Sequence, residues 1–318
     1  MQRVLALASF LCLACSGPPA TLRPDSGPTP DSGEREPDAG PDGPTALTGG
    51  ALTEDVCGVV IVSGSIEVPE GATVTVCAGS TITFDRDVAL TVAGTLRLAG
   101  TADERIQLSS EARWDGIVVS GTLESDFTDI YDAELALEGL AGSLVRFDDG
   151  TISARATRSA RLANGGTFDR TRIIGGSTFR VTGGTLRMTD SEIDLDHATE
   201  SPDCTSVSGA GMVLDHTRFT NCHCPIHINS IEGELTITNS VFDGASYPVM
   251  IARASGTFSN NVFEGIRAQL QDIGGSIDVD LAGNYYVGDA DILDTDDPSQ
   301  FRNVDDALSE RPAGVGPR

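Results

Sequence analysis

The chain has 318 residues and a formal net charge of −26, because 47 acidic residues outnumber 21 basic ones, all of them arginine. A field of this sign repels nucleic acid and anionic lipid head groups, and it disfavours direct binding of an acidic polysaccharide unless a divalent cation bridges the two. With 36 glycines, four methionines and one tryptophan, the composition fits many short strands joined by tight turns.

Residues 1–15 have the pattern of an export signal. Arg3 precedes an apolar run, residues 4–14, which is too short to span a membrane but suits a secretory signal peptide. The phrase Cys12-Leu-Ala-Cys15 resembles a bacterial lipobox, in which the last cysteine is lipidated and becomes the mature N-terminus, although Cys12 stands where leucine is usual. The alternative interpretation is an ordinary signal peptide with two incidental cysteines.

Residues 16–48 are predicted to be a disordered tether. Phrases of proline, aspartate and glycine repeat at 24–27, 30–33, 37–40 and 41–43, and they contain almost nothing that a core can bury. The segment resembles the spacers of bacterial surface lipoproteins. Ser16 replaces the aspartate that is linked to inner-membrane retention, which favours the outer membrane or the cell surface. We therefore expect an exported protein that contacts the membrane through an N-terminal lipid.

Residues 49–288 repeat a phrase in which an aliphatic stretch and a polar turn residue precede one Phe, Ile or Tyr. Apolar and small polar residues alternate within it, the period of two that turns one set of side chains inward. Stacked rungs of a β-solenoid, about 20 to 26 residues each, explain both the pattern and its spacing. Residues 289–318 are expected to form a cap or tail. The closing residues of the seven phrases are Phe147, Ile173, Ile193, Phe219, Phe242, Phe263 and Tyr286.

Several phrases within residues 58–288 have a more specific likeness. They are Val-Pro-Glu-Gly-Ala at 68–72, Leu90-Thr-Val-Ala-Gly-Thr-Leu96, Trp114-Asp-Gly-Ile117, Asn239-Ser-Val-Phe242 and Asn260-Asn-Val-Phe263. In number and order they resemble the right-handed parallel β-helix family of the pectin-lyase-like type. Arg105 departs from that family, whose opening coils often have proline there. The resemblance implies an all-β fold, a right-handed parallel β-helix.

Five cysteines follow Cys15. Because one rung separates Cys57 from Cys77, stacking is expected to bring them together as a disulfide in an exported protein. Cys222 and Cys224 lie two residues apart, a spacing unfavourable for bonding to each other. Cys204 is therefore expected to bond to one of these two, which leaves an odd thiol.

All four histidines lie between 197 and 227, beside three of the cysteines. Alignment on the closing residues stacks Asp196 near Cys222 and His197 near His223, provided that the long excursion at 198–211 does not shift the register. Such a cluster suits zinc or another transition metal. The favoured interpretation is structural, with the cysteines clamping the excursion, because a cysteine in an exported loop is usually in a disulfide.

Acidic residues follow four of the closing residues, at Asp148, Asp194, Asp243 and Glu264. Paired carboxylates at close range bind Ca²⁺ or catalyse glycoside hydrolysis. Ile174 and Thr220 interrupt this series, so outside the adjacent pair Asp243 and Glu264 we expect exposed acidic turns instead. The tail acids are also expected to be solvated, with calcium as the alternative, and they are Asp291, Asp294, Asp296 and Asp297.

The resemblance also raises the question of catalysis, because the family includes polysaccharide lyases and polygalacturonase-like hydrolases. The chain has Asp148-Asp149, which matches one hydrolase motif, but neither the Gly-His-Gly nor the Arg-Ile-Lys motif. We therefore expect no cofactor and a non-enzymatic role in binding, adhesion or surface structure, with a neutral polysaccharide or a surface protein as partner. The alternative is a carbohydrate-active enzyme with its site near 194–227, at Asp194, Asp196, His197 and His223.

Overall fold

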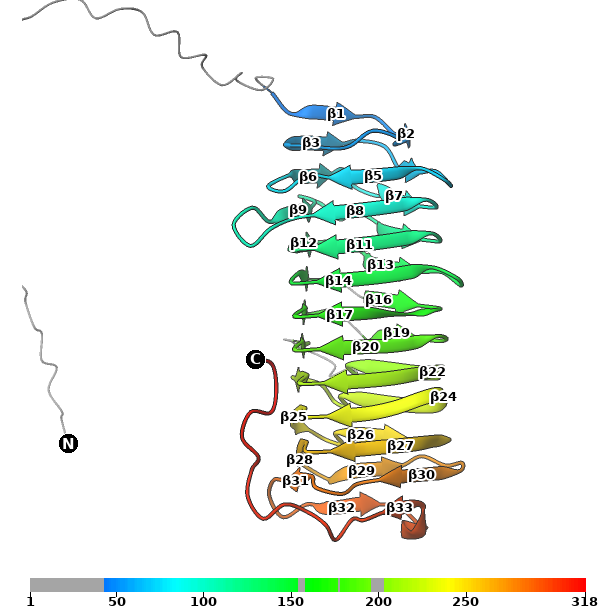
Figure 1. Cartoon of the computed structure of the whole chain (residues 1–318), viewed down its shortest axis with the longest axis vertical. Coiled ribbons are helices and arrows are strands. Elements are labelled where there is room, and N and C mark those ends of the chain that lie inside the picture. Colours follow the sequence, from blue (N-terminus) through cyan, green and yellow to red (C-terminus); the bar gives the residue numbers. More distant parts are fainter. Residues whose placement is uncertain (1–42, 154–157, 177, 196–202) are drawn as a thin grey trace, which may run out of the picture. The chain divides into compact units, whose positions relative to one another are not determined.

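The computed structural model describes residues 43–153, 158–176, 178–195 and 203–318, and these build one parallel β-helix (Figure 1). The predicted signal peptide at 1–15 and residues 16–42 of the predicted tether lie outside the described residues. A typical turn of the helix contains three strands, and equivalent strands of successive turns pair in parallel. The all-β fold class is thus confirmed, and the three stacks of strands are called the first, second and third faces below.

The first face is a sheet of twelve strands in the described part of the chain. Its strands are β1 (Thr45–Leu47), β3 (Val59–Val62), β6 (Thr81–Phe84), β9 (Ile106–Ser109), β12 (Thr128–Tyr131), β15 (Thr151–Ser153), β18 (Arg172–Ile174), β21 (Glu192–Asp194), β23 (Arg218–Thr220), β25 (Val241–Ala245), β28 (Val262–Gly265) and β31 (Tyr285–Tyr286).

The second and third faces form one hydrogen-bonded sheet, because two long strands, β22 (Thr205–Asp215) and β24 (Ile226–Thr238), run through both. The other strands of the second face are β2 (Gly50–Ala51), β4 (Ile66–Val68), β7 (Ala89–Val92), β10 (Gly116–Val119), β13 (Leu135–Gly139), β16 (Arg158–Leu162), β19 (Phe179–Val181), β26 (Val249–Ile251), β29 (Ala268–Asp272) and β32 (Asp291–Asp294). Those of the third face are β5 (Thr73–Val76), β8 (Thr95–Ala99), β11 (Thr122–Asp126), β14 (Leu144–Asp148), β17 (Gly165–Asp169), β20 (Thr185–Thr189), β27 (Ala254–Ser259), β30 (Ile277–Asp280) and β33 (Phe301–Arg302).

Strand pairing therefore extends from β1 to β33, beyond both ends of the repeat region expected at 49–288. A short 3-10 helix, Pro298–Gln300, precedes β33, and Asp297 caps it by accepting a hydrogen bond from the Ser299 amide at 3.2 Å. No helix in the described part of the chain has the length and apolar character needed to cross a membrane.

The register of the first face confirms the predicted rung length. From β3 onward, equivalent residues of successive turns lie between 20 residues apart, as for Ile173 and Ile193, and 26 residues apart, as for Ile193 and Phe219. Six of the seven predicted closing residues form one continuous row on this face, from Ile173 to Tyr286.

The seventh closing residue was wrongly aligned. Phe147 lies on β14 of the third face, where its register partners are Ser125 and Phe168. The residue that precedes Ile173 in the row is Ile152. The error has a physical cause, since an inward aromatic residue next to a polar turn occurs both at the end of a third-face strand and on the first-face strand that follows the turn.

The closing residues fill the interior and stack on one another. Phe242 is completely buried, with its ring 5.3 Å from that of Phe219 and 4.8 Å from that of Phe263, measured between centroids. The planes of these neighbouring rings differ by 10° and 6°. Because the strands pair in parallel and in register, equivalent inward residues of successive turns lie one strand spacing apart. Like side chains therefore stack along the axis of the helix.

The corner between the third and first faces has a repeated backbone conformation. In seven successive turns one residue adopts a left-handed conformation there, with φ between 46° and 56°. Such backbone favours Asn and Asp among residues with side chains, which explains why short polar residues recur at this point of the repeat. The residues concerned are Phe127, Asp149, Arg170, Asp190, His216, Asn239 and Asn260.

The residue after each left-handed position is small or polar and faces inward. Toward the C-terminal end these buried side chains link the turns, since the Thr217 amide donates to Ser240 Oγ at 3.1 Å and the Ser240 amide donates to Asn261 Oδ1 at 2.9 Å. The Asn261 amide in turn donates to Asn284 Oδ1 at 3.1 Å. In these turns the corner amide, which the sheets leave unpaired, is thus satisfied by a side chain of the next turn.

Substitution of Phe242 by alanine tests the inward orientation of the closing row. We expect Phe242→Ala to lower the free energy of unfolding by about 3 to 5 kcal/mol, because it removes a buried ring from between two others. The exposed Val59, replaced by alanine, is the control and is expected to change stability by less than about 0.5 kcal/mol. Denaturant titration monitored by circular dichroism measures both, and equal stability of Phe242→Ala and wild type would contradict the packing.

Candidate functional site

The reactive side chains of the chain gather where β21, β23 and the starts of β22 and β24 meet. The excursion predicted at 198–211 is shorter than expected, because residues 205–211 lie in β22 and pair with β19 and β20; the name is kept below for the segment between β21 and β22. Residues 196–202, including Asp196 and His197, lie outside the described residues. The described part of the site consists of Asp203, Cys204 and the segment from Cys222 to His227.

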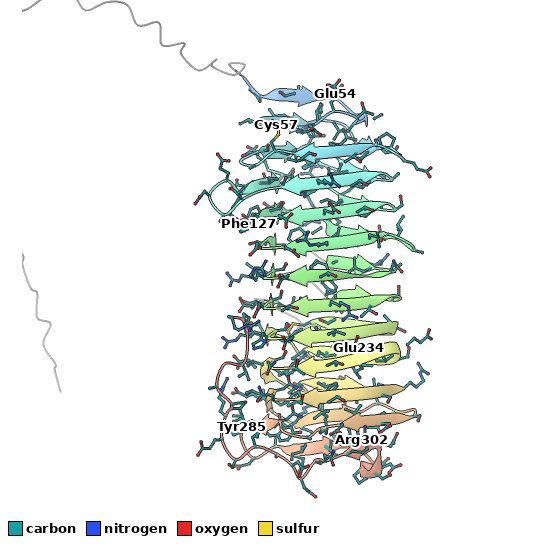
Figure 2. All side chains as sticks on the ribbon, viewed as in Figure 1. Glu54, Cys57, Phe127, Glu234, Tyr285 and Arg302 are labelled. Carbon is teal, nitrogen blue, oxygen red and sulfur yellow. A yellow bond between two sulfur atoms is a disulfide. The ribbon has the colours of Figure 1, made fainter. Side chains whose placement is uncertain are left out.

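A disulfide closes the base of the excursion. Cys204 is bonded to Cys222, with the two Cα atoms 5.5 Å apart. The backbone supports the same contact, because the Cys204 amide donates to the Cys224 carbonyl at 2.9 Å and the Thr205 amide donates to the Pro225 carbonyl at 3.0 Å. The sequence left two partners open for Cys204, and the structure selects Cys222. A second disulfide joins Cys57 to Cys77 near the N-terminal end of the helix, as predicted, with Cα atoms 4.9 Å apart (Figure 2).

Cys224 is the odd thiol, and it is buried. Its Sγ donates a hydrogen bond to the Ile226 carbonyl at 3.0 Å. Burial raises the pKa of the Cys224 thiol far above its ordinary value, and the nearby Asp203 carboxylate raises it further. Because the thiolate is the reactive form, this cysteine is inert at neutral pH.

Two histidines face one carboxylate beside the disulfide. His227 Nδ1 lies 2.8 Å from Asp203 Oδ2, and His223 Nδ1 lies 3.7 Å from Asp203 Oδ1. The three side chains are partly exposed, with exposed fractions of 27% for Asp203, 24% for His227 and 44% for His223. These contacts join Asp203, the residue before Cys204, to the next turn of the helix.

This geometry bears on the zinc alternative. The Cys222 sulfur is bonded to Cys204, so it has no thiolate to offer a metal. Within the described ranges, no three His, Cys, Asp or Glu side chains are placed to hold a metal ion together. The remaining proposed ligands, Asp196 and His197, lie outside those ranges.

The fourth histidine does not join the cluster. His216 is a left-handed corner residue with φ 51°, and its Nδ1 lies 3.0 Å from Asp215 Oδ1. Burial raises the pKa of Asp215, but hydrogen bonds from Asn239 and Thr238, together with the adjacent His216 ring, outweigh burial and lower the pKa below its ordinary value. Asp215 and His216 thus form part of the corner between the third and first faces.

The acidic series proposed from the sequence is not one column. Asp194 is on β21, where it accepts a hydrogen bond from Asn221 Nδ2 at 2.7 Å and lies 3.9 Å from Arg172 Nη2. Asp243 pairs with Arg218 at 3.0 Å. Asp148 follows Phe147 on β14 of the third face, so it does not stack with the other acidic residues of the series, which lie on first-face strands.

Asp148 has an unusual environment of its own. It is only 4% exposed, and its Oδ2 accepts from Arg146 Nη2 while its Oδ1 has no hydrogen-bond partner among the described residues. Burial raises the pKa of Asp148, against the opposing effect of Arg146. Its register partners, Asp126 and Asp169, are also acidic, and they add to the rise.

Sequence reasoning missed Asp203, the residue that both histidines face. The alignment counted forward from Ile193 and stacked Asp196 near Cys222, but Asp196 lies outside the described residues, and the described contact with the next turn begins where the Cys204 amide donates to the Cys224 carbonyl. An alignment of the two turns on a Cys204 to Cys222 contact places Asp203, one residue before Cys204, beside the histidine segment. When the chain was compared with protein-family models, curated proteins and solved structures, none of them matched.

Peptide mapping under non-reducing conditions checks the cysteine assignment. We expect bonds from Cys57 to Cys77 and from Cys204 to Cys222, while Cys224 resists alkylation until the protein is denatured. The Cys222→Ala variant should lose about 2 to 4 kcal/mol of stability, since an 18-residue loop is no longer closed in the unfolded chain. Cys224→Ser is the matched control for alkylation, and a peptide joining Cys204 to Cys224 would contradict the assignment.

Proposed function

We propose that the chain is a lipid-anchored β-helix of the cell envelope, of the pectin-lyase-like type, that binds a partner without catalysis. Cys15 attaches it to the membrane, and the tether, which extends from residue 16 to the start of β1, holds the helix away from that membrane. The outer membrane or the cell surface is the proposed location. The net charge of −26 disfavours nucleic acid and favours a neutral polysaccharide or a surface protein as the partner.

The non-catalytic proposal rests on the bonding of the cysteine and histidine side chains near 194–227. Catalysis by a Cys and His pair needs an accessible thiolate held against an imidazole. Here Cys204 and Cys222 are oxidised to a disulfide, Cys224 is buried with a raised pKa, and His227 is engaged by Asp203. These contacts support a clamp on the excursion better than a reaction centre.

A shallow hollow on the third face is the proposed binding surface. It has a volume of about 340 Å³ and spans β11, β14, β17 and β20. Gly165, with φ 68°, and Gly166 make its floor, and the side chain of Leu144, 62% exposed, stands beside them. Polar groups border it at Thr122, Asn164, Thr167 and Thr185.

The charged groups around this hollow favour a neutral ligand. Arg146 pairs with Asp126 and Asp148, and Arg187 pairs with Glu234 at 3.0 Å. Because each guanidinium is already neutralised by a carboxylate, the hollow offers hydroxyl, amide and aliphatic contacts without a net positive charge. Sugar hydroxyls and the apolar face of a sugar ring match that combination.

Replacement of the lipobox cysteine tests the anchor. In bacterial expression we expect wild-type protein to fractionate with the envelope and Cys15→Ala to appear in the soluble fraction, because no acyl chain holds the variant. Mass spectrometry of the N-terminal peptide checks for the acyl group. A Cys12→Ala variant is the matched control and should remain with the envelope. Envelope fractionation of Cys15→Ala, with no acyl group on wild type, would contradict the anchor.

A glycan panel with simultaneous detection of product release tests the binding role. We expect retention of a neutral glycan without new reducing ends or unsaturated products. Leu144→Ser should weaken binding about fivefold or more, because it removes an apolar contact worth about 1 kcal/mol.

The matched control for this experiment is Ile266→Ser, which changes an aliphatic side chain of similar exposure, 72%, outside the hollow. Its affinity should equal that of wild type. Release of products would overturn the non-catalytic proposal in favour of the carbohydrate-active enzyme, and equal loss in both variants would remove the hollow as the binding surface.

A further inference from the structure

The last segment of the chain, residues 303–318, runs back along the helix (Figure 1, red). Its path is set by contacts to successive turns. The Gly283 amide donates to the Asp306 carbonyl at 2.9 Å, the Leu308 amide donates to the Asn284 carbonyl at 2.8 Å, and the Gly316 amide donates to the Asn239 carbonyl at 2.7 Å. The segment thus follows the corner between the third and first faces, opposite to the direction in which the turns advance.

The outward residues of the first face that lie under this segment differ in polarity from those of the neighbouring turns. The outward position before the closing residue is charged in the three turns around the end of the segment, at Arg172, Glu192 and Arg218. The next two turns have valine there, Val241 and Val262, and these side chains are only 5% and 0% exposed. Gly316 lies directly over Val241, where an added Cβ would be 3.4 Å from Val241 Cγ2.

The apolar character of the row therefore changes near the point that the tail reaches. Outward valines on a β-helix face would expose apolar surface to water unless another segment covered them. We call Val241, Val262 and the adjoining backbone carbonyls of Asn239 and Asn284 the strip. Its chemistry suits an extended peptide, with apolar contact along its length and carbonyl acceptors for the peptide amides.

A charged pair fixes the end of the segment. Arg318 Nε and Nη2 donate to the two carboxylate oxygens of Asp190 at 2.9 Å and 3.0 Å, across 128 residues of sequence. The Asp190 side chain is 12% exposed, whereas that of Arg318 is 61% exposed. An open cavity of about 450 Å³, lined also by Arg170, Arg172 and Arg218, lies beside the pair and admits water and salt. An ion pair in such a place is weakened by added salt.

We propose that residues 303–318 form a displaceable strap, and that the strip beneath it is a peptide-binding site which this segment occupies in the closed state. The strap is joined to the helix by separate contacts rather than by a continuous strand ladder. Breaking the Arg318 pair and the Gly316 hydrogen bond releases its far end without disturbing a sheet. Opening then exposes the strip to a peptide of the same chemistry.

Cleavage of the folded chain tests reversibility. A protease recognition sequence inserted after Asp305 is cut once the full chain has folded, and the freed strap peptide is followed by size-exclusion chromatography. We expect the peptide to bind about two- to fivefold more weakly at about 0.5 M salt than at about 0.05 M salt and to regain its affinity on dilution of the salt, because its latch is an exposed ion pair. One peptide should bind per chain.

Substitution of the latch gives the second measurement. Asp190→Asn should weaken rebinding of the peptide about two- to fivefold, the range expected for an exposed pair. Glu124→Gln, which removes a carboxylate paired with Arg97 on another face, is the matched control and should leave rebinding unchanged. A peptide whose affinity does not change with salt, or one that dissociates and does not rebind, would overturn the proposal.

A third measurement, amide hydrogen exchange, uses the full chain without the inserted protease sequence, so its result does not depend on the insertion. We expect residues 308–318 to exchange faster in Asp190→Asn than in wild type, while peptides from β18 and β21 are unchanged. Identical exchange of the strap in the two proteins would show that Asp190 does not hold it, and this result too would overturn the proposal.

Discussion

The whole structure depends on the corner at which the third face turns into the first. A left-handed residue bends the chain there, and the buried side chain after it accepts a hydrogen bond from the corner amide of the preceding turn, as Ser240, Asn261 and Asn284 do in sequence. An unpaired amide at this depth would cost stability at every turn. Satisfying it from the next turn therefore couples the direction of the chain to the stacking of the rungs.

This corner also explains how the helix tolerates turns of unequal length. The corner and the first-face strand keep their register even in the turn from β21 to β23, where 26 residues separate Ile193 from Phe219. The excursion then needs its own fixation, which the disulfide from Cys204 to Cys222 and the contact between Asp203 and His227 provide. Groups that would be reactive in another setting thus stabilise the least regular turn of the described chain.

Charge has a comparable structural use on the outer surface. Arginines sit between carboxylates of neighbouring turns, as Arg170 does between Asp149 and Asp169, so part of the acidic excess is neutralised locally. Arg318 extends the same pattern by reaching Asp190 from the strap. Individual exposed pairs contribute little to stability, but they offset part of the repulsion where carboxylates of successive turns stack, as Asp126, Asp148 and Asp169 do.

The sequence by itself determined the β-helix, the rung length, the inward row from Ile173 to Tyr286 and the disulfide from Cys57 to Cys77, because these follow from local periodicity repeated at a constant interval. Only the tertiary structure decided that Phe147 belongs to another face, that Cys204 bonds to Cys222, that Asp203 faces the histidines and that the tail covers Val241. Each of these depends on which residues of different turns become neighbours. An excursion changes the number of residues between equivalent positions of two turns by an amount that the periodicity does not encode. The strap runs along several turns in a direction that no repeat describes.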